Sequence, residues 1–530
     1  MPSVVFRFAH KLRQHDEALL LVAAIIPLYF FYTSGLSNNP PGFYLDESAL
    51  AYNAYLIARS GVSESGASWP LYFQLYTGGF VQYAGPTQIY LLAIPFSVFP
   101  PSILLARGFA ATMVFIAALL LGLLATRISR RLGVGIIVAL TAMLTPWLFE
   151  TSRLVLETFF YPLALVLFLL SLYRVQNKER WTLLDNALLA ITLALLTYSY
   201  TIGRLLAPLL ALGLLLFAAN KQRLIGVVKT WVAYGVTLIP LLVFNLRHPG
   251  LLTRFYLVTY IKPQSPWSEI IFKFAKRYTE DLSLMSLLLV GDPNPRHHVP
   301  NSLGSILVGT FLLAAIGLIV VIARHWGDPW WSYILYGLAV SIVPGALTVD
   351  QFHTLRLIGY PVFLLVLIIP GLMWLLEADK ELTKKQLKTR RGKHRRDQRT
   401  SSGEGLSRQT RRAILAILLF LTAAQAIYFQ RKFRLEGPTR YFFDTAYKEV
   451  YDAAMAQRAR PIYLVDGYWG PAYIHAFWYA TLQGKSTSEF IHVDYGKRPP
   501  PGALVISSED KCTNCQIIFS REIYMLYRAL

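Results

Sequence analysis

The sequence predicts an all-α polytopic membrane protein with a small α/β domain near the end of the chain. Of 530 residues, 55% are hydrophobic and only 15% are charged, against about 25% charged residues in soluble proteins. The apolar residues form blocks such as 104–126, and about 20 such residues make a helix that crosses a bilayer core. Lysine and arginine gather in short groups between the blocks, as they do in cytoplasmic loops.

Placing every basic group on the inner side threads the chain through about 11 helices, with a cytoplasmic N-terminus. The expected helices span about 18–36, 102–126, 134–149, 159–173, 183–200, 203–219, 227–246, 303–323, 331–348, 358–376 and 413–429. A twelfth would be added if 85–99 also crossed the membrane. We expect that segment to lie at the interface, because a span there breaks the charge pattern.

This threading divides the chain into four parts. They are a transmembrane catalytic module at 1–376 with outer loops at 37–101 and 247–301, a basic cytoplasmic loop at 377–412, a last span at 413–429, and an extracytoplasmic α/β domain at 430–530. In the last part, helix-like stretches at 441–457 and 471–482 alternate with strand-like stretches. These strands are expected at 461–465, 490–493, 503–507 and 516–519.

The net charge of +21 does not indicate a nucleic-acid partner, because 13 of the Lys and Arg residues lie between Lys380 and Arg412 without interleaved aromatic residues. The chain has two cysteines, Cys512 and Cys515. They are compatible with a small disulfide loop outside the cytoplasm. A zinc site would need two further ligands that the sequence does not indicate.

Five groups of polar residues fall on the outer side under this threading. They are Asp46 and Glu47, Arg153 and Glu157, Arg204, the group Asp292, Arg296 and His297, and the pair His353 and Arg356. Each group has a structural interpretation: Asp46 as a helix cap, Arg153 with Glu157 as an i,i+4 pair, Arg204 as an arginine reaching the interface. Their gathering on one side favours a single water-accessible site.

The residue types in these groups fit transfer of a group from a lipid phosphate. Carboxylates deprotonate a hydroxyl or amide nucleophile and can hold a divalent metal, for which Asp46 and Glu157 are candidates. Arginine and histidine bind a phosphate. A lipid-linked phosphate would reach the site through the bilayer, which explains why the protein is embedded in it.

At these groups the sequence resembles the GT-C superfamily of integral-membrane glycosyltransferases. The likeness is to the branch of protein O-mannosyltransferases and aminoarabinose transferases (glycosyltransferase family 39 and RgtA/B/C/D-like proteins), over about residues 18–376. The matching segments read LDESALAYNAY from Leu45, SRLVLE from Ser152, TYSYTIGR from Thr197, GDPNPRHHVPNSLG from Gly291 and QFHTLRLIGYP from Gln351. No MIR-like domain of the eukaryotic O-mannosyltransferases is evident, so a protein acceptor is not specifically indicated.

The resemblance implies a polyprenyl-phosphate-linked sugar donor, an inverting displacement, and a base in the first outer loop. Asp46 is then the expected base, with Glu47 and Glu157 as further acidic residues. The phosphate and cavity residues implied are Arg153, Arg204, Asp292, Arg296, His297, His353 and Arg356. Tyr52, Asn53 and Tyr200 are weaker candidates for contacts with the sugar or the acceptor, which would be a lipid, a glycan or a protein.

The alternative is a polytopic transporter or a flippase for lipid-linked sugars without transferase activity. Transporters commonly contain paired repeats and place polar groups near the bilayer midplane. Here the polar groups are expected at helix ends and in outer loops, and no internal repeat is evident. The sequence therefore favours an enzyme of the cell membrane with its site on the extracytoplasmic face.

Overall fold

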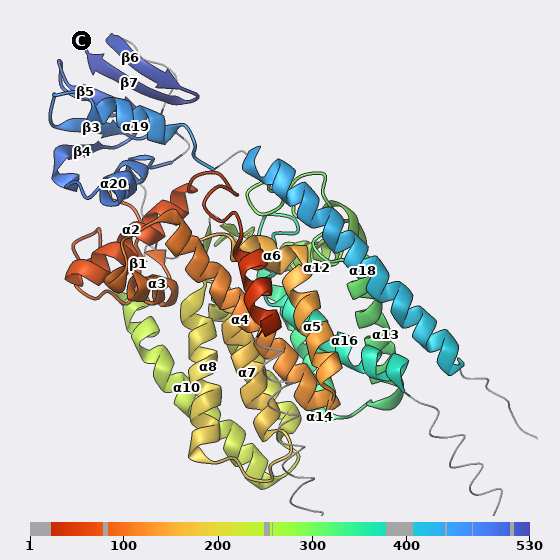
Figure 1. Cartoon of the computed structure of the whole chain (residues 1–530). Helices are drawn as coiled ribbons and strands as arrows, with labels where there is room; N and C mark the ends of the chain where they lie inside the picture. Colours follow the sequence, from red (N-terminus) through yellow and green to blue (C-terminus); the bar gives the residue numbers. More distant parts are fainter. Residues whose placement is uncertain are drawn as a thin grey trace, which may run out of the picture.

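The apolar segments form helices that run side by side in the computed structural model, and a small sheet domain sits at one end of this bundle (Figure 1). The structure describes residues 23–77, 83–248, 255–256, 258–377, 406–439, 443–468, 470–508 and 514–530. The basic N-terminus and most of the expected basic loop at 377–412 lie outside these residues. Both architectural parts agree with the mainly helical class that the sequence predicts.

The apolar helices of the bundle follow one another along most of the chain. They are Ala23–Thr33, α4 (Ile103–Ser129), α5 (Leu132–Leu144), α6 (Pro146–Ser152), α7 (Tyr161–Val175), α8 (Leu183–Ser199), α9 (Gly203–Gly213) with η1 (Leu214–Phe217), α10 (Lys221–Arg247), α13 (Val308–Arg324), α14 (Pro329–Val340), α15 (Val343–Ala346), α16 (Tyr360–Leu376) and α18 (Arg408–Glu436). Shorter elements occupy the two expected outer loops. They are α2 (Leu45–Ser60), β1 (Phe73–Gln74), β2 (Tyr83–Ala84), α3 (Pro86–Val98), α12 (Trp267–Asp281) and η2 (Ser286–Val290).

Helices occur in all eleven segments where spans are expected. Among the described residues, α4, α10 and α18 are each long and apolar enough to cross a membrane, and the bent pair α5–α6 would be a fourth. The other apolar helices have 10–17 residues, fewer than the about 20 of a full span. The number of membrane spans therefore stays a prediction.

Segment 134–149 is not the single helix that the sequence predicts. It is divided into α5 and α6, which meet at an angle of 61°. Pro146 is the cause, because it lacks a backbone N–H and occupies the first turn of α6, where that donor is not needed. The bend buries the whole of α6 and brings Glu150 to the second outer loop.

Close packing in the bundle depends on glycine where α13 meets α16. A Cβ on Gly317 would collide with the backbone oxygen of Leu367, and one on Gly371 would collide with that of Leu313. Small residues at such crossings let two membrane helices approach closely enough for extensive van der Waals contact. Larger residues at either position would force the helices apart.

Segment 85–99 forms α3, which begins at Pro86 and packs against α2 and α8. Its 13 residues make a helix of about 20 Å at 1.5 Å per residue, too short to cross a bilayer core of roughly 30 Å. Other apolar helices for which spans are expected are equally short, so the interfacial placement of this segment stays a prediction. In Figure 1, α2 and α3 lie at the end of the bundle that faces the sheet domain.

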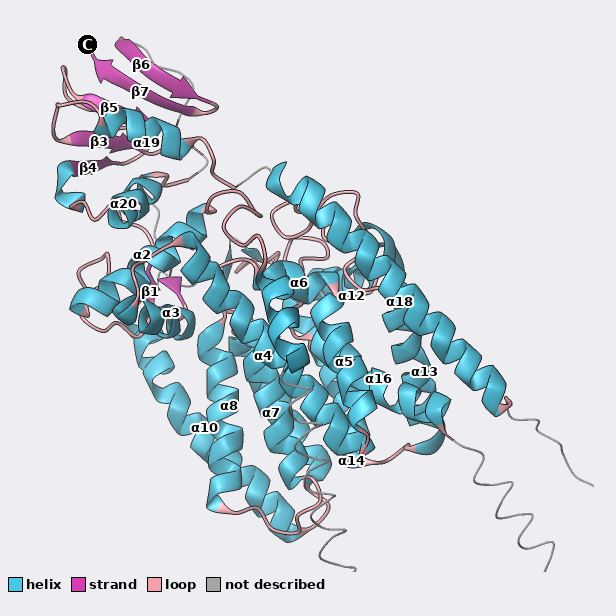
Figure 2. Ribbon diagram, viewed as in Figure 1, coloured by secondary structure: helices cyan, strands magenta, loops and turns pink. Residues whose placement is uncertain are grey.

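The last part of the chain forms an α/β domain whose five-stranded sheet has the order β4-β3-β5-β7-β6 (Figure 2). Its elements are η3 (Gly437–Thr439), α19 (Tyr447–Met455), β3 (Ile462–Val465), α20 (Tyr473–Leu482), η4 (Thr487–Glu489), β4 (Phe490–Val493), β5 (Leu504–Ser507), β6 (Cys515–Arg521) and β7 (Tyr524–Ala529). β3 pairs in parallel with β4 and β5, whereas β7 is antiparallel to both its neighbours. The four expected strands correspond to β3–β6, and β7 is an addition that the sequence analysis missed.

One of the two cysteines lies among the described residues. Cys515 begins β6 and is disulfide-bonded. Cys512, with which we expect it to pair, lies outside the described residues.

Candidate functional site

Asp46 is the second residue of α2, at the end of the bundle below the sheet domain. Its side chain is half-buried, and the Tyr76 hydroxyl donates a hydrogen bond of 2.5 Å to its Oδ1. Tyr76 is fully buried in the loop that precedes β2. The carboxylate is thus held in one orientation by a rigid phenol, as a general base requires.

Glu47, the next residue, has a different environment. Its carboxylate is fully buried against the guanidinium of Arg107 in α4, with distances of 3.0 Å from Nε to Oε1 and 2.8 Å from Nη2 to Oε2. The backbone N–H groups of Val155 and Tyr44 donate to the same carboxylate at 2.9 and 3.0 Å. The Glu47 carboxylate thus accepts four hydrogen bonds inside the protein. This environment favours a structural role for Glu47.

Tyr44, two residues before Asp46, contacts a basic residue from a distant part of the sequence. The guanidinium of Arg296 lies over its ring, 4.5 Å from the ring centre. Tyr44 also packs beside a separate cluster of apolar side chains, Leu154, Leu156, Leu355 and Phe443. Burial and the neighbouring charge of Asp46 raise the pKa of Tyr44, so its hydroxyl stays protonated and able to donate.

Behind Arg296 lies a buried group formed by Asp292, His297 and His353. His297 uses both ring nitrogens: Nδ1 faces Asp292 Oδ2 at 3.0 Å, and Nε2 accepts from Arg296 Nε at 3.0 Å. Thr354 donates to the same Asp292 oxygen through its backbone N–H and its hydroxyl. The centres of the two imidazole rings are 4.5 Å apart.

The charges in this group are unequal. Burial by itself raises the pKa of the Asp292 carboxyl. His297 and the hydrogen bond from Thr354 outweigh burial and hold that pKa well below its usual range. Burial lowers the pKa of His297, and burial together with His297 lowers that of His353 much further. At neutral pH the two imidazoles are therefore neutral, and the positive charge is carried by Arg296 and by Arg356, which pairs with Asp350 at 2.6 Å.

The donor atoms of Asp292, His297 and His353 all lie within 4.8 Å of one another, a spacing compatible with a metal ion. The fit is nevertheless poor. Both nitrogens of His297 are already hydrogen-bonded, and the guanidinium of Arg296 occupies the position that a cation would need. Asp46 and Glu157, the carboxylates for which we expected a metal, are not members of this group. The residues of this group therefore do not fit a metal ion.

Glu157 and Arg204 lie on another side of the same loop region. The backbone N–H of Gly85 donates to Glu157 Oε1 at 2.5 Å, and Gln88 approaches the same oxygen at 3.4 Å. The guanidinium of Arg204 lies over the ring of Tyr72, 4.6 Å from its centre. Burial raises the pKa of Tyr72 to about 12, with Arg204 opposing and Glu157 adding to the rise, so all three groups influence one another.

Comparison with solved structures identifies the architecture. ArnT from Cupriavidus metallidurans in the apo state matches with a TM-score of 0.54 and 13% sequence identity, over 97% of this chain and 98% of that one. The chain has the GT-C fold. No known family profile and no curated protein matches the sequence. The resemblance drawn from the motifs is thus confirmed at the level of the fold.

Two further solved structures match with TM-scores of 0.49 and 12% identity. One is ArnT from Cupriavidus metallidurans bound to undecaprenyl phosphate, over 97% of this chain and 98% of that one. The other is the archaeal oligosaccharyltransferase AglB from Archaeoglobus fulgidus in complex with an inhibitory peptide and a dolichol-phosphate. The match to AglB covers 89% of this chain and 64% of that one.

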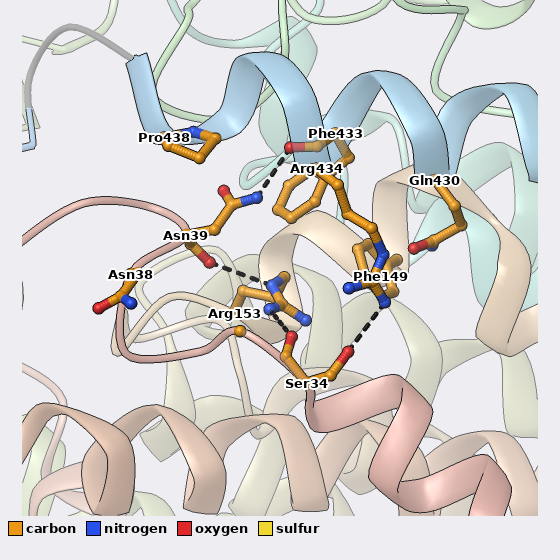
Figure 3. Close-up of a pocket in the computed structure, with 10 residues that line it drawn as sticks. Ser34, Asn38, Asn39, Phe149, Arg153, Gln430, Phe433, Arg434 and Pro438 are labelled. Atoms are coloured by element: carbon orange, nitrogen blue, oxygen red, sulfur yellow. Dashed lines mark hydrogen bonds between the residues drawn. The ribbon is translucent and has the colours of Figure 1, made fainter.

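Within the GT-C fold, several residues that the sequence analysis proposed for the site have other partners. Arg153 is buried and donates to the backbone oxygens of Tyr32, Ser34 and Asn39, so it fixes the start of the first outer loop. It lines a pocket beside α18 (Figure 3). Its guanidinium is therefore committed to backbone contacts in that pocket.

The three weaker candidates for substrate contacts are also placed by the fold. Tyr52 packs against Phe477 of the sheet domain, with ring centres 5.5 Å apart. Asn53 is fully buried and bonds the backbone oxygen of Ala49 and the loop at Glu64. Tyr200 is half-buried against the core of the bundle. The contact of Tyr52 is part of the packing of α2 against α20 of the sheet domain.

Residues that the sequence analysis did not single out complete the site. Tyr44 contacts Arg296, Tyr76 donates a hydrogen bond to Asp46, and Arg107 neutralises Glu47. His298 pairs with Glu150 of α6 at 2.6 Å, and this pair anchors the second outer loop to the bundle. One signal was present for Arg107: a charged residue inside the apolar block 104–126 is unusual enough to predict a buried partner.

The sheet domain reaches the site region through a polar network on its lower side. The Tyr473 hydroxyl donates to Glu64 and accepts from the backbone N–H of Thr77 at 2.8 Å. His492 pairs with Asp466 at 2.6 Å, and its ring centre lies 3.8 Å from that of Tyr473. Thr77 directly follows Tyr76, so the sheet domain holds the loop that orients Asp46.

This network predicts that the protein becomes less stable in mildly alkaline solution. Burial raises the pKa of Glu64 to about 8, despite hydrogen bonds from Tyr473 and Asn53. The unfolded chain loses this proton near pH 4.5, so the folded state holds more protons between these values and stability falls as the pH rises. We expect the melting temperature to fall between pH 6 and 9, and to fall less in Glu64→Gln.

The control for that experiment is Glu449→Gln, because Glu449 is a half-exposed carboxylate of the sheet domain, which Glu64 contacts through Tyr473. It should melt with the pH dependence of the unmodified protein. An equal loss of stability at pH 9 in Glu64→Gln and in the unmodified protein would show that Glu64 is not the titrating group.

Proposed function

We propose that this protein is an integral-membrane glycosyltransferase that moves a sugar from a polyprenyl-phosphate-linked donor to an acceptor on the extracytoplasmic face. The observation that carries the proposal is Asp46, a half-buried carboxylate oriented by Tyr76 and two residues along the chain from Tyr44, whose ring lies under the guanidinium of Arg296. A base beside a cationic group, in a chain with the GT-C fold, is the arrangement that glycosyl transfer from a phosphate needs.

In the proposed reaction Asp46 removes the proton from a hydroxyl or amine of the acceptor. The acceptor atom forms a bond to the anomeric carbon of the sugar, on the face opposite the phosphate. The bond between that carbon and the phosphate oxygen breaks, and its electron pair leaves with the polyprenyl phosphate. One displacement inverts the anomeric configuration. The acceptor class, whether lipid, glycan or protein, is left open.

Arg296 is the residue best placed to stabilise the charge that develops on the leaving phosphate. It is held by His297 and by the ring of Tyr44, so its guanidinium is oriented before the donor arrives. His297 is in turn held by Asp292, whose carboxylate is fixed by Thr354. The neutral histidines thus position the arginine and add no charge.

Substitution of Arg296 tests this role. We expect Arg296→Gln to lower kcat/KM for the donor by about 10–100-fold, because a charge-assisted hydrogen bond to phosphate contributes about 1.5–3 kcal/mol. Initial rates at varied donor concentration, measured with the purified protein in detergent, give this ratio. Arg356→Gln is the comparison, since Arg356 already pairs with Asp350. Equal rates for Arg296→Gln and the unmodified protein would exclude Arg296 from the donor site.

The side of the membrane follows from the charge pattern and belongs to the same proposal. Basic groups at Arg130, Arg223 and Arg324 lie at the end of the bundle away from the sheet domain, and such groups favour the cytoplasmic side. Asp46 and the sheet domain would then face the exterior of the cell membrane. A donor with a polyprenyl chain would enter laterally from the lipid.

A deletion strain tests the function as a whole. Loss of the enzyme should make a polyprenyl-phosphate sugar accumulate and should remove one sugar modification from the cell envelope, both detected by mass spectrometry. Complementation with the Asp46→Asn variant separates the enzyme from a flippase. A transferase requires the base and stays inactive, whereas restoration of the envelope glycan by that variant would favour a flippase or transporter.

A further inference from the structure

Two adjoining cavities open beside α18, at the end of the bundle that carries the sheet domain. The first has a volume of about 180 Å³ and lies between α18, α6 and the loop after the first helix (Figure 3). The second has a volume of about 370 Å³ and extends along α18 toward the middle of the bundle. Gln430 and Arg434 line both cavities, so the two adjoin at these side chains and are together called the groove.

The two ends of this groove differ in chemistry. The larger cavity is lined mainly by apolar side chains, among them Phe31, Ala423, Ala426 and Ile427. The smaller cavity contains apolar side chains such as Phe149 and also polar ones, namely Ser34, Asn38 and Asn39. A groove that is apolar toward the middle of a helical bundle and polar at its end matches a lipid, with a chain below and a headgroup above.

Gln430 lies where the two parts meet, and its amide lacks a partner. The side chain is 7% exposed, and neither its Oε1 nor its Nε2 forms a hydrogen bond with any described residue. The Oδ1 atom of the buried Asn39 is also without a partner. A buried amide that forms no hydrogen bond is costly, so two such groups around one cavity indicate a polar ligand.

The charge at the polar end is positive. Arg153 and Arg434 line the smaller cavity, Arg431 and Arg434 line the larger one, and no carboxylate is among the described lining residues of either. Arg434 reaches from α18 across the first cavity to the Ser34 hydroxyl at 2.8 Å (Figure 3). It also lies over the ring of Phe31. An arginine at a helix end often only extends its charge to the membrane interface. That explanation does not account for Gln430, one turn earlier, whose buried amide forms no hydrogen bond with the described residues.

We propose that this groove binds a membrane lipid with a phosphate headgroup, in a site separate from Asp46. Arg434 and Arg431 hold the phosphate, Gln430 hydrogen-bonds the atoms that join the headgroup to its chain, and the chain lies along α18. The proposal goes beyond the proposed function. The groove is lined by Arg153, two residues before Val155, whose N–H donates to Glu47. A bound lipid would therefore also stabilise the segment that positions Glu47.

Binding of dioleoyl phosphatidic acid to the purified full-length protein tests the proposal, with native mass spectrometry as the readout. We expect Arg434→Gln to weaken binding by about tenfold, through loss of a charge-assisted hydrogen bond. Gln430→Leu should also weaken binding while melting at or above the temperature of the unmodified protein, because it removes a buried unpartnered amide. Arg408→Gln is the matched control, an exposed arginine at the other end of α18.

Two other probes distinguish the source of the phosphate. Dioleoylglycerol, which lacks the phosphate, should bind about tenfold more weakly or not at all. Inorganic phosphate should fail to displace the phosphatidic acid. Equal binding of both lipids, unchanged binding in Arg434→Gln, or full displacement by inorganic phosphate would each overturn the proposal. No arm measures sugar transfer, so failure here is independent of failure of the proposed transferase activity.

Discussion

Asp46→Asn is expected to lower the rate of sugar transfer by about 10²–10⁴-fold, the usual contribution of a positioned general base. Asparagine has nearly the same shape and still accepts the hydrogen bond from Tyr76, but it cannot take a proton from the acceptor. The variant should therefore insert into the membrane and melt like the unmodified protein. Transfer from a labelled polyprenyl-phosphate sugar, assayed in membranes, measures the loss.

Tyr76→Phe is the control that separates orientation from proton transfer. It removes the 2.5 Å hydrogen bond to Asp46 Oδ1 but leaves the carboxylate in place. We expect a smaller loss, about tenfold, since only the alignment of the base is relaxed. If Asp46→Asn retained turnover comparable to that of Tyr76→Phe, Asp46 would not be the base, and Glu157 would be the next carboxylate to test.

The polar groups of the outer loops could be predicted from the sequence because each lies beside an apolar block. The apolar blocks determine where the loops between them begin and end. Asp46, Asp292, His297 and His353 were all proposed on this ground. The residue pattern alone does not assign separate roles to Asp46 and Glu47, and only the family resemblance indicates Asp46 as the base. Successive residues of a helix differ by about 100° in direction, and only the position of Arg107 determines which of the two carboxylates is buried.

Contacts between distant segments were beyond the sequence. Tyr76 bonds Asp46 across 30 positions, and Tyr473 bonds Glu64 across 409. No local pattern predicts such pairs, because they depend on how the sheet domain packs against α2. The bend between α5 and α6 could have been predicted, since Pro146 interrupts the apolar block. The sequence indicates Arg153 as a phosphate or cavity residue, with an i,i+4 pair to Glu157 as the structural alternative, and neither interpretation predicts the backbone oxygens that it binds.

Arg107→Met is expected to destabilise the protein by about 3–5 kcal/mol, the loss usual when one member of a buried ion pair is removed. The Glu47 carboxylate would remain fully buried with only the N–H groups of Val155 and Tyr44 to stabilise its charge. The backbone oxygens of Pro40 and Gly42 would also lose a donor. Thermal unfolding in detergent measures the effect, and the fraction of protein that stays soluble at each temperature is the readout.

The double variant Glu47→Gln with Arg107→Met distinguishes a structural pair from a catalytic one. A neutral glutamine still accepts the N–H of Val155, so the double variant should recover much of the stability that Arg107→Met loses, because no charge is then left without a counter-ion. It should also recover transfer if Glu47 only supports α2. Recovered stability with no transfer would instead mean that the Glu47 carboxylate takes part in the reaction, and that the ion pair with Arg107 opens when substrate binds.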